Sequence, residues 1–173
     1  MRIFFKLAIV CFLIMMPRNC LCNVSPFGLE LNKATIKDFL SKYDVMDIIK
    51  KPNQQTIISV SPKLLDLSGL KTSVCIFDHQ DILQSVILTM DKSHFDEMYK
   101  ILSQKYKIDE KLVPFVGDKY VSFFHKYSFI RINTPHLGFD LKIIYVNKLY
   151  FKKYQDDQEK LEKSEREKKK AVL

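Results

Sequence analysis

The sequence has few of the residues that phosphate-binding sites and disulfide scaffolds require. Glycine occurs four times among 173 residues and nowhere in a cluster, whereas a phosphate-binding loop is rich in glycine. This scarcity argues against nucleotide-dependent enzymes. Cysteine is also scarce: three of the four cysteines lie in the first 22 residues, and only Cys75 lies beyond them.

A long hydrophobic run is lacking as well. The apolar stretch over residues 7–16 is about half of the roughly 20 residues that a membrane-spanning helix needs. It follows Arg2 and Lys6, ends at a proline, and precedes small side chains in Cys20–Cys22. This arrangement is typical of a secretory signal peptide over residues 1–22. A retained N-terminal anchor is the alternative.

Export predicts a periplasmic or extracellular protein whose mature chain begins at Asn23. That chain keeps only Cys75, so no internal disulfide can form. About 130 residues are enough for a domain that its hydrophobic core stabilises alone. Core material is ample, since 47% of the chain is hydrophobic and 12% is aromatic, with thirteen phenylalanines and no tryptophan.

The charge pattern argues against nucleic-acid binding. The formal net charge is +8, but the basic residues are dispersed among acidic ones and form no stripe with interleaved aromatic residues. Such a charge supports, at most, a mild attraction to acidic partners or anionic membrane surfaces.

No catalytic or metal-binding motif is evident. The histidines show no zinc-ligand spacing: they are His79, His94, His125 and His136. Asp78, His79 and Asp81 could hold a metal ion weakly, but ordinary turn chemistry explains them. Cys75 lies in an apolar run, which favours an inert buried thiol over a nucleophile paired with His79.

We predict a protein that is not an enzyme and has no metal or cofactor. A hydrolase using Asp78, His79, His136 or Asp140 is the alternative.

The periodicity predicts one α+β domain over residues 23–151. Two segments have the period of amphipathic helices, with apolar stripes at Ile36, Phe39, Leu40 and Tyr43 and at Phe95, Met98, Leu102 and Tyr106. Each begins with the spacing of a capping box, Thr35 with Asp38 and Ser93 with Asp96.

Three strand patterns follow each helix, at residues 56–61, 70–77 and 82–90 and at residues 120–124, 127–133 and 139–146. We therefore expect an antiparallel sheet with both helices on one face. In the last strand, alternation predicts that Phe139, Leu141, Ile143 and Tyr145 face the core. The similar helix ends, residues 39–43 and 101–106, fit a duplicated α-βββ unit; chance likeness is the alternative.

Residues 152–173 predict an exposed, charged helix. Acidic and basic residues alternate there at i, i+4 spacing, which supports a solvated helix: the pairs are Asp156–Lys160, Glu159–Lys163, Glu162–Arg166 and Glu165–Lys169. Leu161 is the lone apolar residue between Tyr154 and Ala171, so no coiled-coil seam is present.

The element order carries a family resemblance. Gly28-Leu29 leads into the helix at Thr35, and Phe77–Leu83 forms a hairpin in which Asp81 stands where the family has glycine. The chain resembles the barrel-assembly lipoproteins of the bacterial outer membrane, and its two-copy form is similar to β-lactamase inhibitory proteins. The resemblance implies an α+β fold that binds other proteins, and it implies no catalytic residues.

Aromatic residues near the domain edge are candidates for partner binding: Phe123, Phe124, Tyr127, Tyr150 and Phe151. Adjacent strand residues face opposite sides, so one of Phe123 and Phe124 should be buried and the other exposed. The alternative for Tyr150 and Phe151 is a clasp that docks the tail onto the sheet.

We predict a secreted or periplasmic binding module for a protein or envelope component. Weak membrane-surface contact through the N-terminal segment or the tail is a further expectation, and a lipid or small-ligand carrier is the alternative.

Overall fold

A computed structural model describes residues 24–172, so the predicted signal peptide lies outside the described residues. The chain forms an eight-stranded antiparallel sheet of order β1-β2-β3-β4-β8-β7-β6-β5. The strands are β1 (Val45–Lys50), β2 (Thr56–Val60), β3 (Leu70–Phe77), β4 (Leu83–Asp91), β5 (Lys107–Leu112), β6 (Lys119–His125), β7 (Ser128–Thr134) and β8 (Asp140–Asn147). The helices are α2 (Ile36–Leu40), α3 (Phe95–Lys105) and α4 (Lys148–Val172). Short 3₁₀ turns are η1 (Pro26–Gly28), η2 (Pro62–Leu64) and η3 (Lys92–His94).

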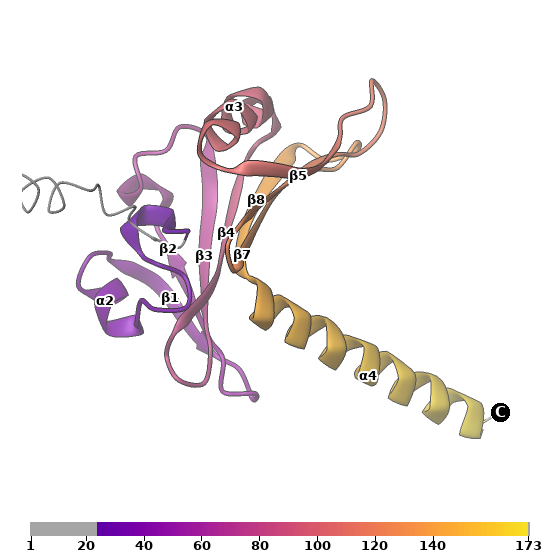
Figure 1. The fold of residues 1–173 in the computed structure, drawn as a ribbon. Coiled ribbons are helices and arrows are strands. Elements are labelled where there is room, and N and C mark those ends of the chain that lie inside the picture. The colour runs from indigo at the N-terminus through magenta and orange to yellow at the C-terminus, as the bar shows by residue number, and fades with distance from the viewer. Residues whose placement is uncertain (1–23, 173) are drawn as a thin grey trace, which may run out of the picture.

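The chain has two halves of the same element order, each a helix followed by four antiparallel strands (Figure 1). The strands of each half run from an edge of the sheet to its centre, where β4 pairs with β8. The prediction of three strands in each half was wrong, because β1 and β5 were missed. Both are edge strands, and nearly all their residues are exposed. An exposed edge strand lacks the alternation by which a half-buried strand is recognised.

One face of the sheet carries the hydrophobic core. The strand register aligns a row of core residues across the sheet, and the row consists of Ile58, Cys75, Val86, Tyr145, Ile130 and Phe123. Both α2 and α3 lie on this face: Phe39 of α2 packs edge-to-face on Phe77, with ring centroids 5.7 Å apart. Met98 and Leu102 of α3 join the same buried cluster. The predicted α+β architecture with helices on one face is confirmed.

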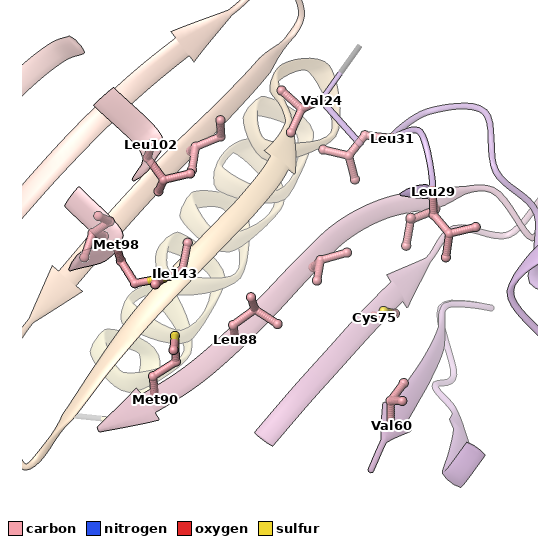
Figure 2. Close-up of a cluster of buried hydrophobic side chains, with 14 of the residues drawn as sticks. Val24, Leu29, Leu31, Val60, Cys75, Leu88, Met90, Met98, Leu102 and Ile143 are labelled. Carbon is pink, nitrogen blue, oxygen red and sulfur yellow. The ribbon is translucent and has the colours of Figure 1, made fainter. Parts of the chain in front are cut away.

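The segment before α2 completes the cover of the first half. Val24, Leu29 and Leu31 are buried in the core cluster, and Figure 2 shows them beside the strands that carry Cys75 and Leu88. The backbone of Asn32 donates to Leu83 O at 2.7 Å. Since α2 has five residues and α3 has eleven, this segment supplies apolar cover that a longer helix supplies in the second half.

The helix starts differ between the halves. Thr35 and Asp38 form the predicted capping box of α2. The corresponding prediction for Ser93 and Asp96 was wrong. Ser93 lies inside the turn η3, where its backbone N–H donates to the Asp91 carboxylate at 3.0 Å, and α3 begins at Phe95. The matching spacing did not reveal that a 3₁₀ turn precedes the helix.

Strand β8 follows the predicted alternation except at its start. Leu141 and Ile143 are buried, and Tyr145 lies in the core row defined above. Phe139, however, precedes the strand and is 85% exposed, so its assignment to the core was wrong. The alternation begins only where β8 pairs with β4, at Asp140.

The C-terminal helix α4 begins at Lys148, before the change of composition at Lys152. Asn147 explains the early start, because its Oδ1 accepts hydrogen bonds from the backbone N–H of Leu149 and Tyr150 at 3.0 and 3.1 Å, as a helix cap does. From Lys152 to Lys170 every residue is exposed, and the helix extends away from the sheet (Figure 1). Of the predicted pairs, Glu162–Arg166 has a separation of 3.4 Å.

Candidate interaction surfaces

The face of the sheet opposite α2 and α3 is called the outer face. Its first half is aliphatic: the register aligns Ile49, Ile57 and Ile76 in one row and Val74 with Ile87 and Ile144 in the next. Ile49 is 44% exposed, and the others are partly exposed. Apolar side chains on an open sheet face are typical of a surface that another molecule covers.

The second half of the outer face carries an aromatic patch, which consists of Phe124, Phe129 and Phe151. Phe151 of α4 stacks on Phe129 of β7 with ring centroids 5.8 Å apart, and Phe124 is paired with Phe129 in the strand register. The first turn of α4 therefore lies on the outer face. There it extends the sheet surface with one more aromatic ring.

Cations flank the aromatic patch. The Arg131 guanidinium lies 5.0 Å from the ring centroid of Phe129, and the Lys148 ammonium lies 5.0 Å from that of Phe124. Lys107 is the register partner of Phe124 on the adjacent strand. Glu110 lies 3.9 Å from Arg131, so it offsets one of these three charges. The patch therefore combines aromatic faces with a positive surround, a combination that suits acidic groups.

The predicted partner-binding residues occupy different environments. Phe123 is fully buried in the core, whereas Phe124 is 39% exposed, as their alternation predicts. The burial of Phe123 removes it from any contact surface. Tyr127 is 68% exposed at the turn between β6 and β7. The hydroxyl of Tyr150 accepts a hydrogen bond from Gln55 Nε2 at 2.8 Å, and burial raises its pKa above the usual value. The Gln55–Tyr150 hydrogen bond and the stack of Phe151 on Phe129 both attach the start of α4 to the rest of the protein. These contacts fit the alternative in which Tyr150 and Phe151 form a clasp.

A cleft of about 660 Å³ lies between α4 and the turns of the first half. Its lining includes Gln55 from the β1–β2 connection, Asp78 and His79 from the β3–β4 turn, and Tyr150 and Lys153 from α4. Its lining combines amide, carboxylate and ammonium groups with apolar surface from Leu149, Tyr154 and Leu161.

The residues of the hydrolase alternative lie in two separate places: Asp78 and His79 line the cleft, whereas His136 lies in the β7–β8 loop and Asp140 begins β8. Asp78 precedes β4 and Asp140 pairs with Asp91 at the end of β4, so the length of a nine-residue strand, about 25 Å, separates them. Asp78 Oδ1 accepts from the backbone N–H of Gln80 and Ile82, at 2.9 and 3.0 Å. These bonds give the Asp78 carboxylate a role in the turn.

The thiol of Cys75 lies in the hydrophobic core. It is 1% exposed, and burial raises its pKa to about 12. A thiol with so high a pKa is a poor nucleophile near neutral pH. Within residues 24–172, no cluster of three or more histidine, cysteine or acidic side chains could hold a metal ion.

Sequence reasoning missed an apolar tip, which consists of Phe115 and Val116 in the β5–β6 loop and Leu137 and Phe139 in the β7–β8 loop. Phe115 is 102% exposed, Leu137 is 91% exposed and Val116 is 65% exposed. The loops are joined, because His136 N donates to Asp118 Oδ1 at 2.7 Å. The available signal was the run Val113–Val116, which is apolar although a loop of this kind is usually polar.

Searches against protein families, curated proteins and solved structures found no match to this chain. Among the helices described for residues 24–172, none has both the length and the apolar character required to cross a membrane.

Proposed function

We propose that the protein is an exported, non-enzymatic binding module. Its outer face would take a protein partner that presents an apolar surface with acidic residues. The observation that supports this most directly is the aromatic patch on the face that α2 and α3 leave uncovered. Aromatic residues and arginine are enriched among the residues that dominate binding energy at protein interfaces.

The surroundings of the patch favour the same type of partner. Phe151 is held by its stack on Phe129 and Arg131 by its hydrogen bond to Ser122 Oγ at 3.0 Å. These contacts order the patch before a partner binds, which lowers the entropy cost of association. The flanking cations would steer an acidic partner to the surface and fix its orientation.

Site-specific photo-crosslinking in the native host tests the proposal. A benzoylphenylalanine replaces Phe124 on the outer face or Leu40 on α2, which is 47% exposed and serves as the control. We expect a protein captured at Phe124 and not at Leu40. When purified, that protein should bind more weakly to the Lys148→Glu variant and at higher salt. Capture from both positions alike, or binding that Lys148→Glu leaves unchanged, would contradict the proposal.

A further inference from the structure

The apolar tip concentrates the most exposed large hydrophobic side chains of residues 24–172. Among the described side chains, the large hydrophobic residues with more than 80% exposure are Phe115, Leu137 and Phe139. All three lie at one end of the second half, where the β5–β6 loop extends beyond the sheet (Figure 1). Exposed apolar patches of this kind mark sites of protein or membrane contact.

The fold itself does not require apolar residues at these positions. In the first half, the β1–β2 connection is Lys51–Gln55 and the β3–β4 turn is Asp78–Ile82, and both consist mainly of polar residues. These connections hold the same places in the element order as the loops of the apolar tip. Closing these turns therefore does not require the hydrophobic side chains of the tip.

Backbone groups beside the apolar residues of the tip form hydrogen bonds within the protein. The Lys92 ammonium donates to the carbonyl oxygens of Pro135, His136 and Gly138 at 2.9, 3.0 and 3.3 Å. Gly117 N donates to His136 Nδ1 at 3.3 Å. A loop can leave water only if its backbone groups keep hydrogen bonds, because each unpaired group costs free energy in an apolar medium.

We propose that the apolar tip inserts into the interfacial region of a lipid bilayer that contains anionic headgroups. The inference goes beyond the proposed function and does not depend on it. Phe115, Val116, Leu137 and Phe139 would enter the boundary between headgroups and acyl chains. Lys111 and Lys119 lie at the stem of the β5–β6 hairpin, with their ammonium groups over the rings of Tyr99 and Phe95. From there they would reach lipid phosphates at the level of the headgroups.

A bilayer fits the tip better than a protein pocket does. A protein interface surrounds its apolar centre with a polar rim that forms hydrogen bonds across the contact. In the tip, the polar groups of Lys92, Asp118 and His136 are engaged in holding the two loops. The side chains that remain outward are hydrocarbon and aromatic, on a convex projection, and hydrocarbon contact needs no directional partner.

The absence of tryptophan from the chain allows a direct test with single-tryptophan reporters. The full chain with Phe115→Trp is compared with the full chain with Tyr127→Trp, an exposed position at the opposite end of β6. Both are mixed with vesicles of phosphatidylcholine and phosphatidylglycerol, with and without brominated acyl chains. We expect the emission of the tip reporter alone to shift to shorter wavelength and to be quenched by bromine. Any attachment through residues 1–22 is common to both proteins and cannot produce this difference.

Two outcomes would overturn the proposal. One is an unchanged tip reporter in the presence of vesicles, which would assign the tip to a protein partner. The other is equal quenching of both reporters, which would mean that the tip is not the inserted surface. A second measurement compares vesicle binding of the Phe115→Ser and Leu137→Ser variants with that of the Leu40→Ser control. Each tip substitution should weaken partitioning about tenfold, and the control should not.

Discussion

The corresponding loops of the two halves differ in chemistry although their strands are arranged alike. The β1–β2 and β3–β4 connections are polar and line a cleft beside α4, whereas the β5–β6 and β7–β8 connections expose Phe115, Leu137 and Phe139 to solvent. Since one four-stranded arrangement accepts both kinds of loop, loop chemistry here is independent of the fold. The two halves therefore differ in the chemical groups that their loops offer for contact with other molecules.

The two faces of the sheet differ in a related way. The inner face is sealed by α2, α3 and the segment that contains Val24 and Leu31, and it holds the sheet together. The outer face keeps partly exposed isoleucines in the first half and an aromatic patch in the second. Hydrophobic residues on the inner face should thus affect stability, and those on the outer face and tip should affect binding.

The largest expected effect comes from truncating core aromatics in each half. Phe77 of β3 and Phe123 of β6 are both fully buried. Replacing either by alanine should cost about 3–5 kcal/mol of the free energy of unfolding, through lost burial and a residual cavity. Urea unfolding followed by circular dichroism measures the loss. Both variants should unfold in one transition, because both residues belong to one cluster; two separate transitions would show that the halves are independent.

An intermediate effect should distinguish the two helix starts. Thr35→Ala removes a capping box and should cost about 1 kcal/mol, while Ser93→Ala should cost less, since its capping contact comes from the Asp91 carboxylate. The same urea experiment applies to both. Equal losses would indicate that the two helix starts are equally dependent on their hydroxyl side chains.

The capping box also predicts a dependence on pH. Hydrogen bonds from the backbone and side chain of Thr35 lower the pKa of Asp38. A lowered pKa in the folded state stabilises the protein above the ordinary carboxyl pKa, about 4, and this stabilisation is lost as the pH falls through the lowered value. The stability difference between the wild type and Thr35→Ala should therefore narrow in acid. A difference that stays constant down to low pH would contradict the hydrogen bond from the Thr35 hydroxyl to the Asp38 carboxylate.

Much of the fold follows from periodicity in the sequence. The stripes at Phe39 and at Met98 and Leu102 predicted both helices, and the adjacent Phe123 and Phe124 predicted one buried and one exposed ring. The edge strands β1 and β5 could not be found in this way, since burial on one face is what creates alternation. Phe139 was assigned to the core because the alternation was extended past the end of the strand pairing.

The interaction surfaces were less predictable. Phe124 and Phe151 were candidates from their position near the domain edge. Phe129 was missed because it lies in an ordinary strand pattern and joins the patch through its pairing with Phe124 and its stack with Phe151. The apolar tip joins two loops that are distant in sequence, through His136 and Asp118. One sequence does not show that contact, and exposure cannot be inferred from hydrophobic character alone.

The most direct test of this account is the free energy of unfolding of the full chain with Phe115→Ser, Leu137→Ser and Phe139→Ser, measured in urea. Exposed side chains that serve contact and not folding should leave it nearly unchanged, within about 0.5 kcal/mol for each site. A loss of several kcal/mol, comparable with that of Phe77→Ala, would contradict the account, because it would show that the apolar tip belongs to the folded core.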